Sequence, residues 1–150
     1  MMRYVLIGIA SLALTACGSS DSASDPETEL RAWVDRGEAA AESKDRGQLL
    51  DMISGDYADS RGNDRDEIGT MLARYFFVQN NIALLTSIDE IQVYDDTAAM
   101  IDLTVGMAGT QNTGFRLKAD AYRFEFELEK EGDDWLLIGM RYGELGGTLH

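Results

Sequence analysis

The spacing of apolar residues changes near the middle of the chain, and this change limits the fold class. Before Asn81, apolar side chains recur every three to four residues, which is the period of an amphipathic helix. After Asn81 they recur at every second residue, which is the period of a strand with one buried face. Helices that precede the strands, rather than alternating with them, predict an α+β fold in which helices cover one face of an antiparallel sheet.

Three helices are expected in the first part of the chain. The first begins after Asp25, whose carboxylate can cap it, and Pro26 suits its first position. The second covers residues 46–53, and the third covers residues 64–79 with Asn63 as its N-cap. The side chains expected to face the core are Leu30, Trp33, Val34, Gly37 and Ala41 in the first helix, Leu49, Leu50, Met52 and Ile53 in the second, and Ile68, Met71, Leu72, Tyr75 and Phe76 in the third.

Four strands are expected after residue 81. In the first strand, the apolar residues occupy even-numbered positions before Asp89-Glu90 and odd-numbered positions after it. This change predicts a β-bulge at Asp89-Glu90. Residues 109–114 are expected to form a loop between the second and third strands. The last strand, residues 135–142, has apolar residues at both odd-numbered and even-numbered positions. This pattern predicts a central strand whose outer face meets a second copy in a homodimer. The alternating core residues are Ile82, Leu84, Thr86, Ile88, Ile91 and Val93, then Ile101, Leu103, Val105 and Met107, then Tyr122, Phe124, Phe126 and Leu128.

The order of these elements resembles the NTF2-like superfamily. The resemblance is carried by the Asp56-Tyr57 turn, the bulged strand and the final Trp135-Leu136-Leu137-Ile138 run, and it covers residues 27–143. The loop 56–62 and the segment 81–86 are similar to those of bacterial NTF2-like lipoproteins. The resemblance implies a cone of about three N-terminal helices packed on a curved four-stranded antiparallel sheet. Because the superfamily holds isomerases, dehydratases, cyclases and non-catalytic binders, it implies no single activity.

A short apolar segment precedes the only cysteine of the chain. It runs without charge from Tyr4 to Leu14-Thr15-Ala16-Cys17, after the single positive charge of Arg3. The segment is too short to span a bilayer, which takes about 20 apolar residues. The last four residues resemble the maturation site of bacterial lipoproteins, where the cysteine is lipidated and the chain is cut before it. The resemblance implies a signal peptide over residues 1–16, a flexible tether over 17–25 and a domain over 26–145; an ordinary cleaved signal is the alternative.

The residue after the cysteine indicates in which membrane the protein is anchored, and the net charge limits which partners it can bind. Gly18 stands where an Asp would retain an enterobacterial lipoprotein in the inner membrane, which implies the periplasmic face of the outer membrane. Removal of residues 1–16 leaves 12 Lys and Arg against 27 Asp and Glu, a formal charge of −15. Such a surface repels nucleic acid and anionic lipid. The expected partners are the membrane, through the lipid anchor, and a small apolar ligand or another envelope protein.

Few kinds of catalytic chemistry are open to this composition. The only histidine is His150, so neither a Ser-His-Asp triad nor a histidine-based metal site is expected. No nucleotide-binding glycine pattern is present, and no cofactor is expected. In NTF2-like isomerases, an Asp base and a Tyr or protonated Asp in an apolar cavity transfer the proton. Asp120 shares the parity of Tyr122 and Phe124 and is the candidate base, whereas Asp102 is expected to face outward.

The candidate site also contains aromatic and basic side chains. Each of them has a structural interpretation, since buried tyrosines are often core residues and an arginine at a sheet edge often forms a salt bridge. Because no paired acid–base motif is present, the favoured function is a non-catalytic binding or interaction module. The alternative is an isomerase- or lyase-like enzyme that uses Asp120 with a tyrosine. The candidate cavity residues are Trp33, Tyr57, Tyr75, Asp120, Tyr122 and Arg141.

Overall fold

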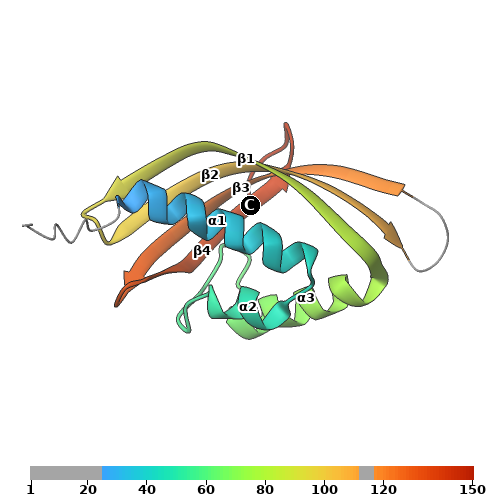
Figure 1. The fold of residues 1–150 in the computed structure, drawn as a ribbon, viewed down its shortest axis with the longest axis horizontal. Coiled ribbons are helices and arrows are strands. Elements are labelled where there is room, and N and C mark those ends of the chain that lie inside the picture. The colour runs from blue at the N-terminus through green and yellow to red at the C-terminus, as the bar shows by residue number, and fades with distance from the viewer. Residues whose placement is uncertain (1–24, 112–116) are drawn as a thin grey trace, which may run out of the picture.

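The computed structural model describes residues 25–111 and 117–150, and in these ranges three helices precede a four-stranded antiparallel sheet (Figure 1). The α+β prediction is therefore confirmed. The expected signal peptide and lipidated Cys17 lie outside the described residues, as does most of the tether. None of the helices in the described ranges is long and apolar enough to cross a bilayer. The elements are α1 (Pro26–Glu42), α2 (Arg46–Asp51), α3 (Arg65–Val78), β1 (Gln79–Tyr94), β2 (Ala98–Gln111), β3 (Leu117–Glu131) and β4 (Asp134–Glu144), and the strand order is β1-β2-β3-β4.

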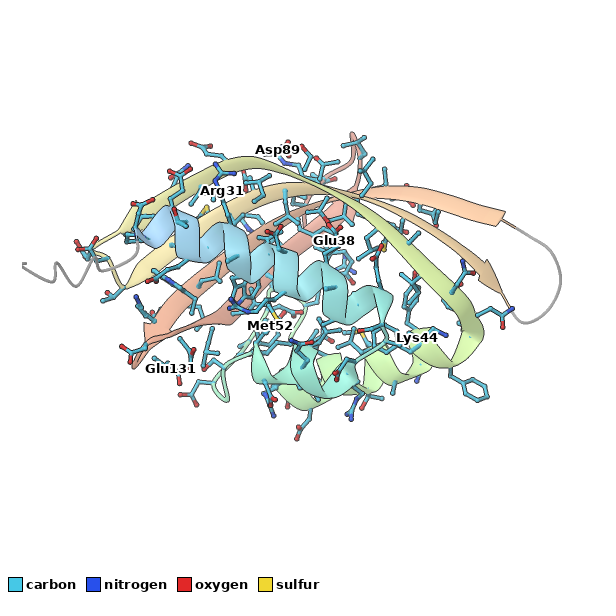
Figure 2. All side chains as sticks on the ribbon, viewed as in Figure 1. Arg31, Glu38, Lys44, Met52, Asp89 and Glu131 are labelled. Carbon is cyan, nitrogen blue, oxygen red and sulfur yellow. The ribbon has the colours of Figure 1, made fainter. Side chains whose placement is uncertain are left out.

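The sheet is curved, and the helices lie on its concave side (Figure 1). The register of β1 on β2 shifts between Ile88 and Glu90, which confirms the predicted bulge, and β4 is bulged opposite Glu127 and Leu128. Bulges bend a sheet and increase its twist. Figure 2 shows Met52 below α1 on the inner side and Asp89 on the outside of the sheet. The most deeply buried apolar residues include Leu30 of α1, Ile101 of β2 and Leu128 of β3.

The helix starts follow capping chemistry, with one correction to the sequence prediction. The Asp25 carboxylate accepts a hydrogen bond from the Thr28 backbone N–H, so α1 begins as expected. α3 is capped by Asp64, not Asn63. Asp64 and Glu67 form a capping box in which each carboxylate accepts the backbone N–H of the other residue, both at 2.9 Å. Asn63 donates its side-chain amide to Asp59 instead, so the predicted cap was wrong by one residue.

Two expected element boundaries are also corrected. α2 ends at Asp51, two residues before the predicted end, because Ile53 leaves the helix to form a parallel bridge with Leu137 of β4. The loop expected to begin at Gly109 begins later, because β2 continues to Gln111 and Gly109 pairs with Ile82 of β1. The remainder of that expected loop lies outside the described residues.

The position of β4 in the sheet differs from the prediction. It was expected at the centre, yet it is an edge strand paired only with β3 inside the sheet. Two features of the structure explain why β4 has apolar residues at both its odd-numbered and its even-numbered positions. The bulge at Ile138 changes the parity, and the segment after α2 covers the outer edge through hydrogen bonds between Ser54 N–H and Leu137 C=O and between Leu137 N–H and Met52 C=O, both 3.0 Å.

Candidate functional site

Four aromatic side chains lie next to one another on the concave face of β3 and β4, and we call them the aromatic row: Tyr122, Phe124, Phe126 and Tyr142. Phe124 is central, with ring centroids 5.6 Å from Phe126, 6.4 Å from Tyr122 and 5.7 Å from Tyr142, on which it stacks at 22°. All four side chains are only half-buried although they face the helices. Solvent therefore reaches this part of the concave face, which the helices do not fill.

Asp120 lies on the same face as the aromatic row. Strand register pairs Asp120 with Met107 and pairs Tyr122 with Val105, which is buried in the core. Because side chains on one strand alternate between faces, Asp120 and Tyr122 both point to the concave side. Asp120 is half-buried there. The structure thus places the candidate base beside the candidate tyrosine on the half-open face.

Trp33 and Tyr57 lie deeper than the aromatic row. The Trp33 ring meets Phe126 edge-on at 5.8 Å, and the indole N–H has no hydrogen-bond acceptor among the described residues. Tyr57 is only 2% exposed, and its hydroxyl donates to Asp59 at 3.3 Å. Burial raises the pKa of the Tyr57 phenol above its ordinary value, and the Asp59 carboxylate raises it further. Tyr57 therefore remains a neutral donor that joins the loop after α2 to the core.

The Asp59 carboxylate organises that loop. It accepts hydrogen bonds from the Tyr57 hydroxyl, from the Arg61 backbone N–H and from both the backbone and the side chain of Asn63. Its burial raises the pKa of the carboxyl, but the hydrogen bonds outweigh this effect and hold the pKa below its usual value. Asp59 is therefore the charged acceptor that fixes the backbone around Arg61.

Arg61 and Tyr142 form a contact that the sequence analysis missed. The guanidinium lies 4.0 Å from the centre of the Tyr142 ring and donates to the Tyr142 hydroxyl at 2.8 Å. Arg61 thus packs on one end of the aromatic row by a cation–π contact. The two residues are 81 positions apart. The only signal in the sequence was the apolar and aromatic pattern of residues 135–142, which does not indicate a partner in the loop.

The remaining predicted residues lie elsewhere. Tyr75 is on α3 and 36% exposed, so it is not part of the buried core face that was predicted for this helix. Arg141 lies on the convex face, where it forms a salt bridge with Glu125. Asp102 faces outward as expected and pairs with Arg123 at 3.0 Å.

The concave site therefore brings together Asp120, Tyr122 and the other members of the aromatic row, but not Tyr75 or Arg141. In the described parts of the chain, no three His, Cys, Asp or Glu side chains are grouped to hold a metal ion.

Comparison with known proteins supports the fold. No protein-family model and no curated protein sequence matches the chain. A candidate scytalone dehydratase from Novosphingobium aromaticivorans is similar over 83% of this chain and 85% of its own, with 11% identity and a TM-score of 0.73. A ketosteroid isomerase-like protein from Erwinia carotovora atroseptica covers 81% of this chain and 98% of its own, with 13% identity and a TM-score of 0.68.

A third solved structure carries the superfamily name. It is a candidate dehydratase of the NTF2-like family from Streptomyces avermitilis, similar over 79% of this chain and 96% of its own, with 11% identity and a TM-score of 0.68. In this chain, the similarity extends over most of a fold in which three helices cover a curved antiparallel sheet. The chain therefore has the NTF2-like fold.

Proposed function

We propose that this protein binds a small, largely apolar molecule on its aromatic row without transforming it, while a lipid on Cys17 holds it at the periplasmic face of the outer membrane. The observation that carries the binding proposal is the incomplete burial of four aromatic rings that face the inside of the cone. Each partly exposed ring leaves some apolar area in water, at a cost of about 25 cal/mol per Å². A flat apolar ligand that covers the rings removes this cost.

The chemistry of the row favours an aromatic ligand. Offset stacking and edge-to-face contacts, at centroid separations of about 4.5 to 7 Å, add to the gain from burial. The row already contains one stacked pair, Phe124 with Tyr142, and the Tyr142 hydroxyl is held by Arg61. Ligand binding would therefore meet a surface whose rings are ordered before the ligand arrives, which lowers the entropic cost of binding.

Substitution of Phe124 tests this proposal, with 2-naphthol as the probe. Phe124→Leu removes the ring that contacts the three other members of the row, so we expect about a tenfold loss of affinity in a fluorescence titration. Phe77→Leu is the matched control, because Phe77 is 82% exposed at the end of α3. Thermal melts of both variants establish that each is folded. Equal losses in the two variants, or no binding of 2-naphthol to the unmodified protein, contradict the proposal.

A second candidate function is proton transfer by Asp120. It is favoured by the position of Asp120 beside Tyr122 on the concave face, which provides a carboxylate and a phenol next to an apolar surface. In an enzyme of this kind, Asp120→Asn would lower kcat by about 10² to 10⁴ and leave the melting temperature nearly unchanged. The measurement is the rate of deuterium exchange at the acidic carbon of a panel of aromatic ketones. No exchange above the buffer rate with the unmodified protein rules out this second function.

A further inference from the structure

A positive charge lies against one end of the aromatic row. The Arg61 guanidinium lies 4.0 Å from the centre of the Tyr142 ring, and it donates to the Tyr142 hydroxyl at 2.8 Å and to the Tyr142 carbonyl oxygen at 3.5 Å. The same ring stacks on Phe124, the central member of the row, with ring centroids 5.7 Å apart. Because Arg61 and Phe124 contact one ring, a molecule of two fused rings that covers Phe124 can place a substituent at the guanidinium.

The charge of Arg61 is not neutralised by a neighbouring acid. None of the ion pairs among the described residues includes Arg61, and its side chain is exposed. The nearest acid in the sequence, Asp59, accepts the backbone N–H of Arg61 and not a guanidinium N–H. A guanidinium carries five N–H donors, and the contacts with Tyr142 use two of them. Charged donors therefore remain available to a ligand.

Arg61 is also held in position by the protein itself. The Asp59 carboxylate accepts the backbone N–H groups of Arg61 and Asn63, both at 2.9 Å, and the hydroxyl of the buried Tyr57 donates to the same carboxylate. The contact with Tyr142 then fixes the guanidinium. None of these contacts involves residues 145–150. A charged group that is ordered in advance loses little conformational freedom when a ligand binds.

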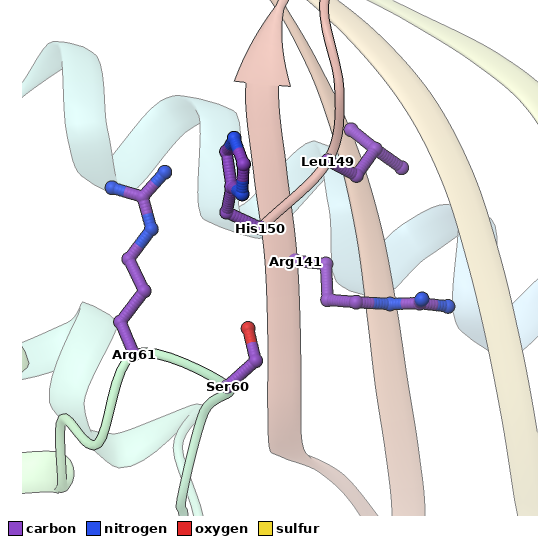
Figure 3. A pocket seen from close by; sticks show the side chains of 5 residues that line it. All are labelled: Ser60, Arg61, Arg141, Leu149 and His150. Atoms are coloured by element: carbon purple, nitrogen blue, oxygen red, sulfur yellow. The ribbon is translucent and has the colours of Figure 1, made fainter.

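The arginine of β4 does not provide a second cation for the row. Figure 3 shows that the Arg141 side chain is directed away from Arg61. Arg141 lies on the convex face of the sheet, where it forms a salt bridge with Glu125. The positive group that a ligand on the aromatic row meets is therefore Arg61.

The negative group on the same face lies in a different direction. Asp120 is on β3, four residues from Phe124, which is about 13 Å at 3.3 Å per residue. Arg61, by contrast, is reached from Phe124 across the neighbouring Tyr142 of β4. An anionic group on the ligand is repelled near Asp120 and attracted near Arg61, so the two charges favour one orientation of an anionic ligand.

We infer that the ligand of the aromatic row is a planar aromatic carboxylate whose acid group binds Arg61. This inference rests on the proposed binding function of the row. The aromatic part of the ligand covers Phe124, and its carboxylate accepts charge-assisted hydrogen bonds from the guanidinium N–H groups that Tyr142 leaves free. Guanidinium and carboxylate are both planar and can form two parallel hydrogen bonds. Arg61 thus makes the site selective for acids over neutral molecules of the same shape.

The test compares 2-naphthoate with 2-naphthamide, which has the same rings and nearly the same shape but no charge. In fluorescence titrations of the full-length protein, we expect 2-naphthoate to bind at least about tenfold more tightly than 2-naphthamide. Arg61→Gln should reduce this preference to less than about twofold and leave the affinity for 2-naphthamide nearly unchanged. Arg74→Gln is the matched control, because it removes an exposed arginine from α3, and it should retain the preference.

The preference is a ratio measured within each variant, so a general loosening of the row in Arg61→Gln does not change it. The inference is overturned if the unmodified protein binds both probes equally, if Arg61→Gln keeps the preference, or if Arg74→Gln loses it. A protein that binds 2-naphthol and 2-naphthamide without preferring 2-naphthoate retains the proposed binding function and contradicts only the role of Arg61. Absence of binding of all three probes contradicts both.

Discussion

Replacing Cys17 by alanine is expected to release the protein from membranes completely. In the proposed mature form, two or three acyl chains hold the domain, and each buried CH₂ contributes about 0.8 kcal/mol to membrane binding. Without the thiol there is no attachment point for these chains, and the acidic surface, with a formal charge of −14 for the whole chain, provides no electrostatic attraction to anionic lipid. The measurement is the fraction of protein that sediments with the membranes of producing cells.

The control for this prediction is Ser19→Ala, which changes the expected tether but leaves the lipidation cysteine intact. It should sediment like the unmodified protein. Mass spectrometry of the N-terminal peptide gives a second readout, because a lipidated Cys17 adds the mass of its acyl groups. A Cys17→Ala variant that still sediments with membranes would show that another part of the chain holds the protein there.

Replacing Leu30 by alanine is expected to lower the free energy of unfolding by about 3 to 5 kcal/mol. The Leu30 side chain has no solvent exposure and belongs to the core cluster between α1 and the sheet, together with Ile101 and Leu128. Truncation removes buried methyl groups and leaves a cavity that the surrounding strands cannot close. Because single domains are stable by only about 5 to 15 kcal/mol, the loss is a large part of the total. Urea unfolding measures it.

Leu85→Ala is the matched control, since it removes the same atoms from a side chain that is 78% exposed on the convex face of β1. Its unfolding free energy should change by no more than about 0.5 kcal/mol. If the two substitutions cost the same, α1 does not pack on the sheet as described. The comparison therefore tests the helix-on-sheet arrangement separately from any function.

Local chemistry made much of the fold predictable from sequence. The change from helical to alternating period predicted α+β, and the parity slip at Asp89-Glu90 predicted the bulge that the strand register shows. The helix start at Asp25 followed from one capping carboxylate. Two errors concerned the ends of helices. Asp64 with Glu67 forms a better capping box than Asn63 could, and Ile53 left its helix because a backbone bridge to Leu137 was available.

The candidate sites depended on contacts that no local pattern contains. Alternation placed Asp120 on the face of Tyr122 and Phe124, because the side-chain period of a strand is two whatever the rest of the chain does. It could not show that Arg61 packs on Tyr142, or that β4 lies at the edge of the sheet.

The sequence by itself therefore determined the elements, their order and the inward-facing positions of β2 and β3, since propensity and periodicity act over a few residues. The tertiary structure alone decided which side chains of the concave face remain partly exposed and which strand lies at the edge of the sheet. These features result from contacts between segments far apart in the chain. They depend on shape and strand order, which apolar spacing does not specify.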